Sequence, residues 1–287
     1  MSLFGKTVDA TDPYFLALRD DTRFAVVRRH VEELWSRFSD YADPHFSNEI
    51  STQFLSRYWE MYLGSTLLEL GFTLHPTGGA GPDLSASKGN MRVLLEARSV
   101  GPGLGSDSVP EPPGGEAEAQ PVPINRITLR ITSAIRDKNI QRASHAAQGL
   151  LPPDLPFVIA IHVGGISSAH TNSLVPLCAH ACLGIRNVGF RIGGGPTPDR
   201  VLVPRANIQK SSGEPIDTRM FLMSESSGIA GLLLASVNPF SIPPERGGFE
   251  YLHNPSASHP LPRGWFKKGV EYWMEEDMLT YQEHDAA

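Results

Sequence analysis

The sequence contains few cysteines and no long hydrophobic run. Its two cysteines, Cys178 and Cys182, are too few for a disulfide scaffold and are typical of a protein in a reducing compartment. The apolar run Ile229–Val237 is much shorter than the roughly 20 residues that a membrane-spanning helix needs. Residues Met1–Pro13 contain neither the apolar stretch nor the small-residue cleavage site of a signal peptide. We therefore expect a cytoplasmic protein that does not enter a membrane.

Positive charge is also scarce. The 287 residues include 25 lysines and arginines against 31 acidic residues, which gives a formal net charge of −6. Such a chain has no overall positive field that would attract nucleic acid, so any basic binding surface must be local. Glycine and proline, in contrast, are abundant, with 27 and 24 residues. This composition predicts many turns and excludes a mainly helical bundle, while 40% hydrophobic residues are enough for a globular core.

Hydrophobic periodicity predicts two helices followed by three strands. Apolar residues three or four positions apart predict helices over Phe24–Phe38 and Ser51–Leu70, and the second carries Glu60 on the same stripe as Leu63. A hairpin turn at Lys88-Gly89-Asn90 separates the last two of the three strands. These strands are expected at Phe72–His75, Asp83–Ser87 and Met91–Val100.

The segment Gly101–Pro123 has a different composition from the rest of the chain. It contains Gly, Pro, Ser, Glu and Ala and almost no large apolar residue, which predicts a flexible excursion. Because insertions in surface loops share this composition, the composition alone does not mark a domain boundary. A helix over Arg126–Ala147 and a buried strand over Phe157–Val163 should follow it. Further expected elements are a short helix at Leu174–Leu183, a loop at Gly193-Gly194-Gly195, and strands at Val201–Pro204 and Gly231–Val237.

Two carboxylates lie where the predicted hairpin would bring them together. Asp83 opens one strand and Glu96 lies inside the next, so both carboxylates could bind one divalent cation. Glu60 on the preceding helix could complete the site. Glu96 is flanked by apolar residues, and a carboxylate there is unfavourable unless it is paired or bound to metal. The alternative is that Glu96 pairs with Arg98 or Arg92 at an exposed edge.

Pro82-Asp83, the triplet Glu96-Ala97-Arg98 and the order of helix, three strands, helix and strand resemble the restriction-endonuclease-like, or PD-(D/E)xK, superfamily. The resemblance covers roughly Ser51–Val163. It implies an α/β fold with a mixed central sheet flanked by helices. Asp83 and Glu96 would bind Mg²⁺ or Mn²⁺, with the Ala97 carbonyl as a further ligand and Glu60 as an auxiliary acid.

This resemblance sets the expected domains and the expected function. Residues 1–50 would be an N-terminal helical extension, residues 51–165 the core with its flexible insertion at 101–123, and residues 166–287 a C-terminal elaboration packed on the core. The function would be metal-dependent hydrolysis of phosphodiester bonds in nucleic acid, with DNA as the favoured substrate. A homodimer is compatible with this expectation. The alternative is a catalytically inactive domain of the same fold that serves as a binding or structural protein.

Arg98 departs from the family pattern, in which a lysine usually occupies this position. Guanidinium stays charged and cannot act as a base, but it could stabilise negative charge on phosphate oxygens through two parallel hydrogen bonds. The lysine could instead be Lys138, which follows Ile131 and Ala134 on one stripe of its helix, with Gln141 nearly one turn later. The alternative for Lys138 is a side chain that extends from the end of the stripe into solvent.

Two further groups of residues are weaker candidates. Arg263 and Lys267, beside Trp265 and Phe266, form a basic and aromatic patch that could contact a phosphate backbone together with Gln141. A solvated helix start is the alternative for that patch. The group Cys178-Ala-His180-Ala-Cys182 has the residue types of a metal site. On a helix, however, His180 would point away from the two cysteines, which favours core cysteines.

Overall fold

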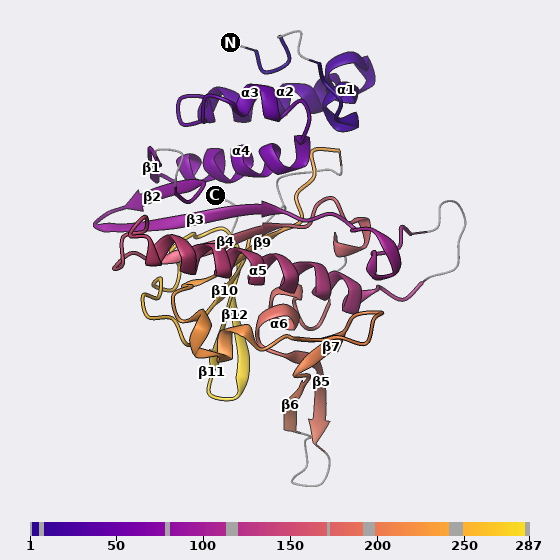
Figure 1. The fold of residues 1–287 in the computed structure, drawn as a ribbon, viewed down its shortest axis with the longest axis vertical. Coiled ribbons are helices and arrows are strands. Elements are labelled where there is room, and N and C mark those ends of the chain that lie inside the picture. Colours follow the sequence, from indigo (N-terminus) through magenta and orange to yellow (C-terminus); the bar gives the residue numbers. More distant parts are fainter. Residues whose placement is uncertain are drawn as a thin grey trace.

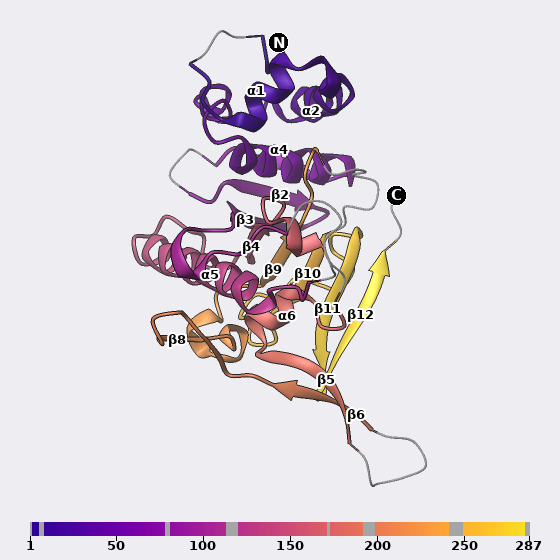
Figure 2. The same cartoon turned by 90° about the vertical axis from the view of Figure 1, so that its right-hand side faces the viewer.

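The computed structural model has the predicted α/β class and is built around one large mixed sheet. It describes residues 2–5, 9–77, 81–112, 120–170, 173–191, 199–240 and 249–284. Eight strands lie side by side in the order β1 (Thr73–His75), β2 (Leu84–Lys88), β3 (Met91–Ser99), β4 (Phe157–His162), β9 (Gly231–Ala235), β10 (Glu250–His253), β11 (Gly269–Glu275) and β12 (Met278–His284). Helices cover both faces of this sheet (Figure 1, Figure 2).

The sheet contains two parallel groups that run in opposite directions. Strands β3, β4 and β9 are parallel to one another, and β10 is parallel to β11. The pairs β1–β2, β2–β3, β9–β10 and β11–β12 are antiparallel. Every residue of β4 and β9 is buried. Burial on both faces explains why these two strands are almost uninterrupted apolar runs in the sequence.

Four helices precede the sheet, namely α1 (Pro13–Asp20), α2 (Ala25–Phe38), α3 (Phe46–Glu49) and α4 (Phe54–Glu69). Helix α4 lies directly on the sheet, and α1 and α2 form an outer layer over α4 (Figure 1). Gly64 in α4 permits this close packing, because a Cβ atom there would lie only 2.4 Å from the Phe38 ring of α2. The two helices predicted before the first strand therefore both form, and they stack on one another.

Helices α5 (Ile124–Ala147) and α6 (Leu177–Cys182) lie on the other face of the sheet. Side chains alternate along β3, so Val93 and Leu95 join the core beneath α4 while Leu94 joins the core beneath α5. By the same alternation, Glu96 is on the α5 side. The alternation thus places a charged side chain between the sheet and a long helix.

Shorter elements complete the described part of the chain. The hairpin β5 (Ile185–Arg191) and β6 (Asp199–Pro204) projects from the body (Figure 1), and β7 (Asn207–Gln209) pairs with β8 (Pro215–Asp217). The 3-10 helices are η1 (Thr22–Phe24), η2 (Gly105–Asp107), η3 (Ser167–His170), η4 (Met220–Leu222) and η5 (Ser224–Ser226). None of the described helices combines the length and the apolar character needed to cross a bilayer.

The loop before β11 differs from what the sequence predicts. The segment with Arg263 and Lys267 does not begin a helix; it is a loop that leads into β11. The reason is packing, because Phe266 is buried and stacks on Phe72 with ring centroids 6.2 Å apart. Trp265 meets the same ring edge-on at 5.5 Å. The aromatic residues of this patch therefore anchor the loop to the core.

The segment predicted as a flexible excursion is attached to the body along its first part. Val109 is only 4% exposed, and its N–H donates a hydrogen bond of 2.8 Å to the Pro102 carbonyl. The Asp107 carboxylate accepts a hydrogen bond of 2.7 Å from the Ser211 N–H. Residues 113–119 of the segment, and the predicted loop at Gly193-Gly194-Gly195, lie outside the described residues. Flexibility of the whole segment stays a prediction.

Candidate functional site

Asp83 and Glu96 are adjacent at the start of β2. Leu84 pairs with Leu95 in the antiparallel register, so Asp83, one residue earlier, lies beside Glu96. The Ala97 N–H donates a hydrogen bond of 2.7 Å to Asp83 Oδ2, which holds that carboxylate against β3. Glu96 is 5% exposed and belongs to an inner strand of the sheet, so it does not lie at an exposed edge. The adjacency of the two carboxylates follows from the hairpin that the sequence predicts.

Lys138 reaches Glu96 from α5. Its Nζ donates to Glu96 Oε1 and, at 3.1 Å, to Gln141 Oε1. The Lys138 side chain is 17% exposed and that of Glu96 is 6% exposed, so this is a mostly buried ion pair. The alternative of a lysine extended into solvent is therefore wrong, because the stripe of α5 brings Lys138 over Glu96, the one acidic residue of β3. Glu96 pairs with neither Arg98 nor Arg92. The Nε of Arg92 instead donates a hydrogen bond of 2.7 Å to Ser85 Oγ.

Glu60 approaches Asp83 from α4, which covers the opposite face of the sheet. Glu60 is 8% exposed, and its Oε2 accepts a hydrogen bond of 2.5 Å from Arg57 Nη1. The same guanidinium pairs with Asp43 at 3.1 Å and with Glu49. Arg57 thus joins Glu60 to acidic residues that precede α4.

Burial raises the pKa of two of these carboxyl groups. It is the main reason that the pKa of Asp83 rises to about 6, and the charge of Glu96 raises it further, whereas the Ala97 N–H and the charges of Lys138 and Arg57 oppose the rise. Burial likewise raises the pKa of Glu60 to about 7; Arg57 opposes this rise, and the charge of Asp83 adds to it. Asp83 is therefore electrostatically linked to Glu96 on one side and to Glu60 on the other.

The three carboxylates do not form a complete metal centre. Within the described ranges, no group of three or more His, Cys, Asp or Glu side chains is arranged to hold a metal ion. Asp83 and Glu96 nevertheless fit a hard divalent cation chemically, because they offer two carboxylates on adjacent strands whose like charges raise the pKa of Asp83. The Ala97 carbonyl lies on the same strand as Glu96. Glu60, bound by Arg57, is placed as a neighbour of this pair.

The other predicted site residues lie apart from this cluster or on its border. Arg98 is exposed and, within the part of the chain that the structure describes, forms no side-chain hydrogen bond or ion pair. Alternation along β3 places it on the same side as Glu96. The Arg263 guanidinium lies 4.2 Å from the centre of the Trp273 ring and 3.9 Å from Glu275. No described hydrogen bond or ion pair links Arg263 or Lys267 to the carboxylates.

Cys178 and Cys182 are fully buried free thiols, as expected for core cysteines. Burial raises the pKa of both thiols well above the usual value, which leaves them protonated and unreactive. The His180 ring is used elsewhere, since its Nδ1 lies 2.7 Å from the Ile185 carbonyl oxygen. Among described residues these three side chains form no metal site.

Sequence reasoning missed Arg57, although one signal for it was present. Arg57 precedes Glu60 by three residues on a helix, a spacing at which opposite charges meet. Comparison with known proteins adds no further residues: the chain has no significant match among family models, curated proteins or solved structures. Function must therefore be argued from the geometry of the chain itself.

Proposed function

We propose that this protein is a metal-dependent nuclease that hydrolyses phosphodiester bonds in nucleic acid, with DNA as the favoured substrate. The observation that carries the proposal is the placement of Asp83 and Glu96 on neighbouring strands, with Lys138 bound to Glu96. This set of residues is what the resemblance to the PD-(D/E)xK superfamily implies, with the lysine supplied by α5. A bound Mg²⁺ or Mn²⁺ would supply charge neutralisation and a lowered pKa for water.

Each residue of the cluster has a role that follows from its position. Asp83 and Glu96 would bind the cation, and the Ala97 N–H keeps Asp83 oriented toward β3. Lys138, held by Gln141, contributes positive charge where a phosphate would be bound. Glu60, whose pKa lies at about 7, can accept or donate a proton near neutral pH. Exposed Arg98 would bind phosphate oxygens from the border of the site.

Cleavage of nucleic acid tests the proposal directly. Purified wild-type protein should cleave single- or double-stranded DNA or RNA in Mg²⁺ or Mn²⁺ and should stop when EDTA removes the metal. Asp83→Asn and Glu96→Gln should each abolish cleavage, because each removes a metal ligand. The matched control is Asp137→Asn, which removes an exposed carboxylate one residue from Lys138 and should leave cleavage unchanged.

A second candidate function is supported by the Glu96–Lys138 ion pair itself. Lys138 neutralises Glu96 without any metal, as it would in an inactive domain that keeps the fold for binding. This alternative predicts that wild-type protein is inert on all four substrates. It also predicts that neither Mg²⁺ nor Mn²⁺ raises the melting temperature, whereas a nuclease with this site should be stabilised by metal. Inert protein with an unchanged melting temperature would overturn the nuclease proposal.

A further inference from the structure

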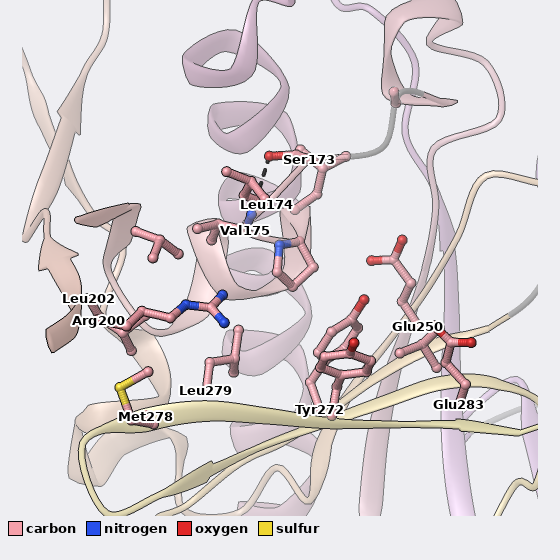
Figure 3. A pocket seen from close by; sticks show the side chains of 16 residues that line it. Ser173, Leu174, Val175, Arg200, Leu202, Glu250, Tyr272, Met278, Leu279 and Glu283 are labelled. Atoms are coloured by element: carbon pink, nitrogen blue, oxygen red, sulfur yellow. Dashed lines mark hydrogen bonds between the residues drawn. The ribbon is translucent and has the colours of Figure 1, made fainter. Parts of the chain in front are cut away.

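A pocket separate from the carboxylate cluster lies between the β5–β6 hairpin, α6 and the strands β10–β12. Its cavity volume is about 440 Å³, within the usual range for small-molecule sites. Figure 3 shows Arg200 extending from β6 on one side, with Glu250 and Tyr272 on the sheet side. None of the residues proposed for phosphodiester hydrolysis lines this pocket, so it requires its own explanation.

Glu250 is the least exposed of the three charged residues that line this pocket, Arg200, Glu250 and Glu283. Within the described ranges its carboxylate has one hydrogen-bond partner, the Cys178 thiol, with Sγ 3.9 Å from Oε2. A thiol is a weak donor and does not compensate a carboxylate for the loss of water. Burial accordingly raises the pKa of Glu250 to about 7. A cationic ligand would supply the missing charge.

Aromatic and aliphatic side chains line the same pocket. Tyr272 and Tyr281, on neighbouring strands, place their ring centroids 6.2 Å apart with 44° between the ring planes. Leu202 and Leu279 add aliphatic surface. Rings of this kind attract organic cations through their π-electron faces and also cover the apolar part of a ligand.

We propose that this pocket binds a small organic amine that carries one ammonium group on an apolar body. The ammonium would pair with Glu250, and the apolar body would lie against Tyr272 and Tyr281. The charged residues that line the pocket are Arg200, Glu250 and Glu283, so one ammonium group makes their total charge zero when Glu250 is ionised. The ligand class is therefore a monoamine, and this conclusion does not depend on nuclease activity.

Phenethylamine is a suitable probe, because it combines one ammonium group with a phenyl ring. Isothermal titration calorimetry at pH 8 should show saturable binding of phenethylamine. The neutral isostere 2-phenylethanol and the anion 3-phenylpropionate should bind at least about tenfold more weakly, since neither supplies the charge that Glu250 needs. Equal binding of all three probes, tighter binding of the anion, or no binding of phenethylamine at millimolar concentration would overturn the proposal.

Variants connect binding to the pocket residues. Glu250→Gln should weaken phenethylamine binding at least about tenfold, whereas Glu276→Gln, in the turn after β11, should leave it unchanged. Tyr281→Ala provides a second test, because Tyr281 is 61% exposed and its removal does not disturb the core. It should also weaken binding. Full affinity in both Glu250→Gln and Tyr281→Ala would show that the amine binds elsewhere.

The pH dependence of the same titration gives an independent readout. Glu250 faces the Cys178 thiol of α6, Tyr272 of β11, and the other charged lining residues Arg200 and Glu283. Cys178 and Tyr272 stay neutral near pH 7 because burial raises the pKa of each. Affinity for phenethylamine should therefore fall as the pH is lowered from 8 to 6 and Glu250 takes up a proton. Affinity that does not change over this range would contradict the assigned role of Glu250.

Discussion

Glu271 and the carboxylates of the candidate site are all buried, but their pKa values are shifted in opposite directions. The pKa is lowered at Glu271 and raised at Glu60 and Asp83. Glu271 is 3% exposed, about as buried as Glu96 and Glu60 at 5% and 8%. Burial pushes the pKa of Glu271 upward, but hydrogen bonds from His253, Gly264 and His284 outweigh it and leave the pKa below its ordinary value. In the candidate site the balance is reversed, and the pKa of Glu60 is raised to about 7.

The number of hydrogen-bond donors distinguishes Glu271 from the carboxylates of the candidate site. Glu271 accepts from His253 at 2.7 Å, from His284 at 3.1 Å and from the Gly264 N–H at 2.7 Å. Asp83, in contrast, has one hydrogen-bond donor among the described residues, the Ala97 N–H, and a like-charged neighbour. A carboxylate surrounded by donors stabilises the fold, whereas one short of donors is suited to binding a cation. Substitutions at the two groups should separate these roles.

The largest effect is expected at Glu271. Glu271→Ala leaves two histidines and a backbone N–H without their acceptor, and it should lower the free energy of unfolding by about 3 kcal/mol. Urea denaturation at pH 7 would measure this loss. The control is Glu275→Ala, which removes an exposed carboxylate of the same strand and should change the free energy of unfolding by less than about 0.5 kcal/mol. A loss at Glu271 no larger than at Glu275 would remove the distinction between the two groups.

The second prediction concerns how the free energy of unfolding depends on pH. The folded-state pKa values of Glu60 and Asp83, about 7 and about 6, lie above those of ordinary carboxyl groups. Their protonated forms therefore favour the native state. This contribution is fully present below about pH 4 and is lost as the pH rises through 6 to 7. In metal-free buffer the free energy of unfolding should therefore decrease between pH 4 and pH 8.

A double variant shows whether this loss belongs to the candidate site. Glu60→Gln with Asp83→Asn should flatten the decrease in stability between pH 4 and pH 8. Glu250 titrates in the same range, so both proteins should carry Glu250→Gln as a common background. Chemical denaturation across this range measures the slope. An unchanged slope in the double variant would contradict the raised pKa values.

The fold around the candidate site was accessible from the sequence, whereas the last three strands of the sheet, β10 to β12, were not. The elements from α4 to β4 have local hydrophobic periodicity, and the turn at Lys88-Gly89-Asn90 sets the pairing of β2 with β3. Strand β10 has only four residues and pairs in parallel with β11, so its position depends on contacts distant in sequence. Local patterns do not encode such pairing.

The same distinction applies within the site. The adjacency of Asp83 and Glu96 needs only the hairpin, and it was predicted. The Lys138–Glu96 contact depends on how α5 packs on the sheet, and Arg57 is recruited by residues that precede α4. Packing between separate elements fixes both contacts. Sequence periodicity identified the helix face that carries Lys138, but it did not show that this side chain contacts Glu96.

The third prediction breaks the Glu96–Lys138 pair. Lys138→Met keeps the aliphatic stem but leaves Glu96 unpaired beside Asp83, so the free energy of unfolding at pH 8 should fall by about 1–2 kcal/mol. Adding Glu96→Gln should recover most of this loss, because the unpaired charge is then removed. Thermal and urea denaturation of the two variants measure the difference. Equal losses in the single and double variants would indicate that Lys138 acts through packing alone.

The smallest effect on stability is expected at Arg98, where the predicted effect on activity is large. Arg98→Ala removes an exposed side chain without a hydrogen bond or ion pair among the described residues, so the free energy of unfolding should change by less than about 0.5 kcal/mol. If Arg98 binds the scissile phosphate, the same variant should lower metal-dependent cleavage by about 100-fold, and Arg98→Lys should retain activity. Arg136→Ala, at an exposed position of α5, is the control for loss of one positive charge. Equal cleavage by the Arg98→Ala and Arg136→Ala variants would restrict the catalytic role to Lys138 and the carboxylates.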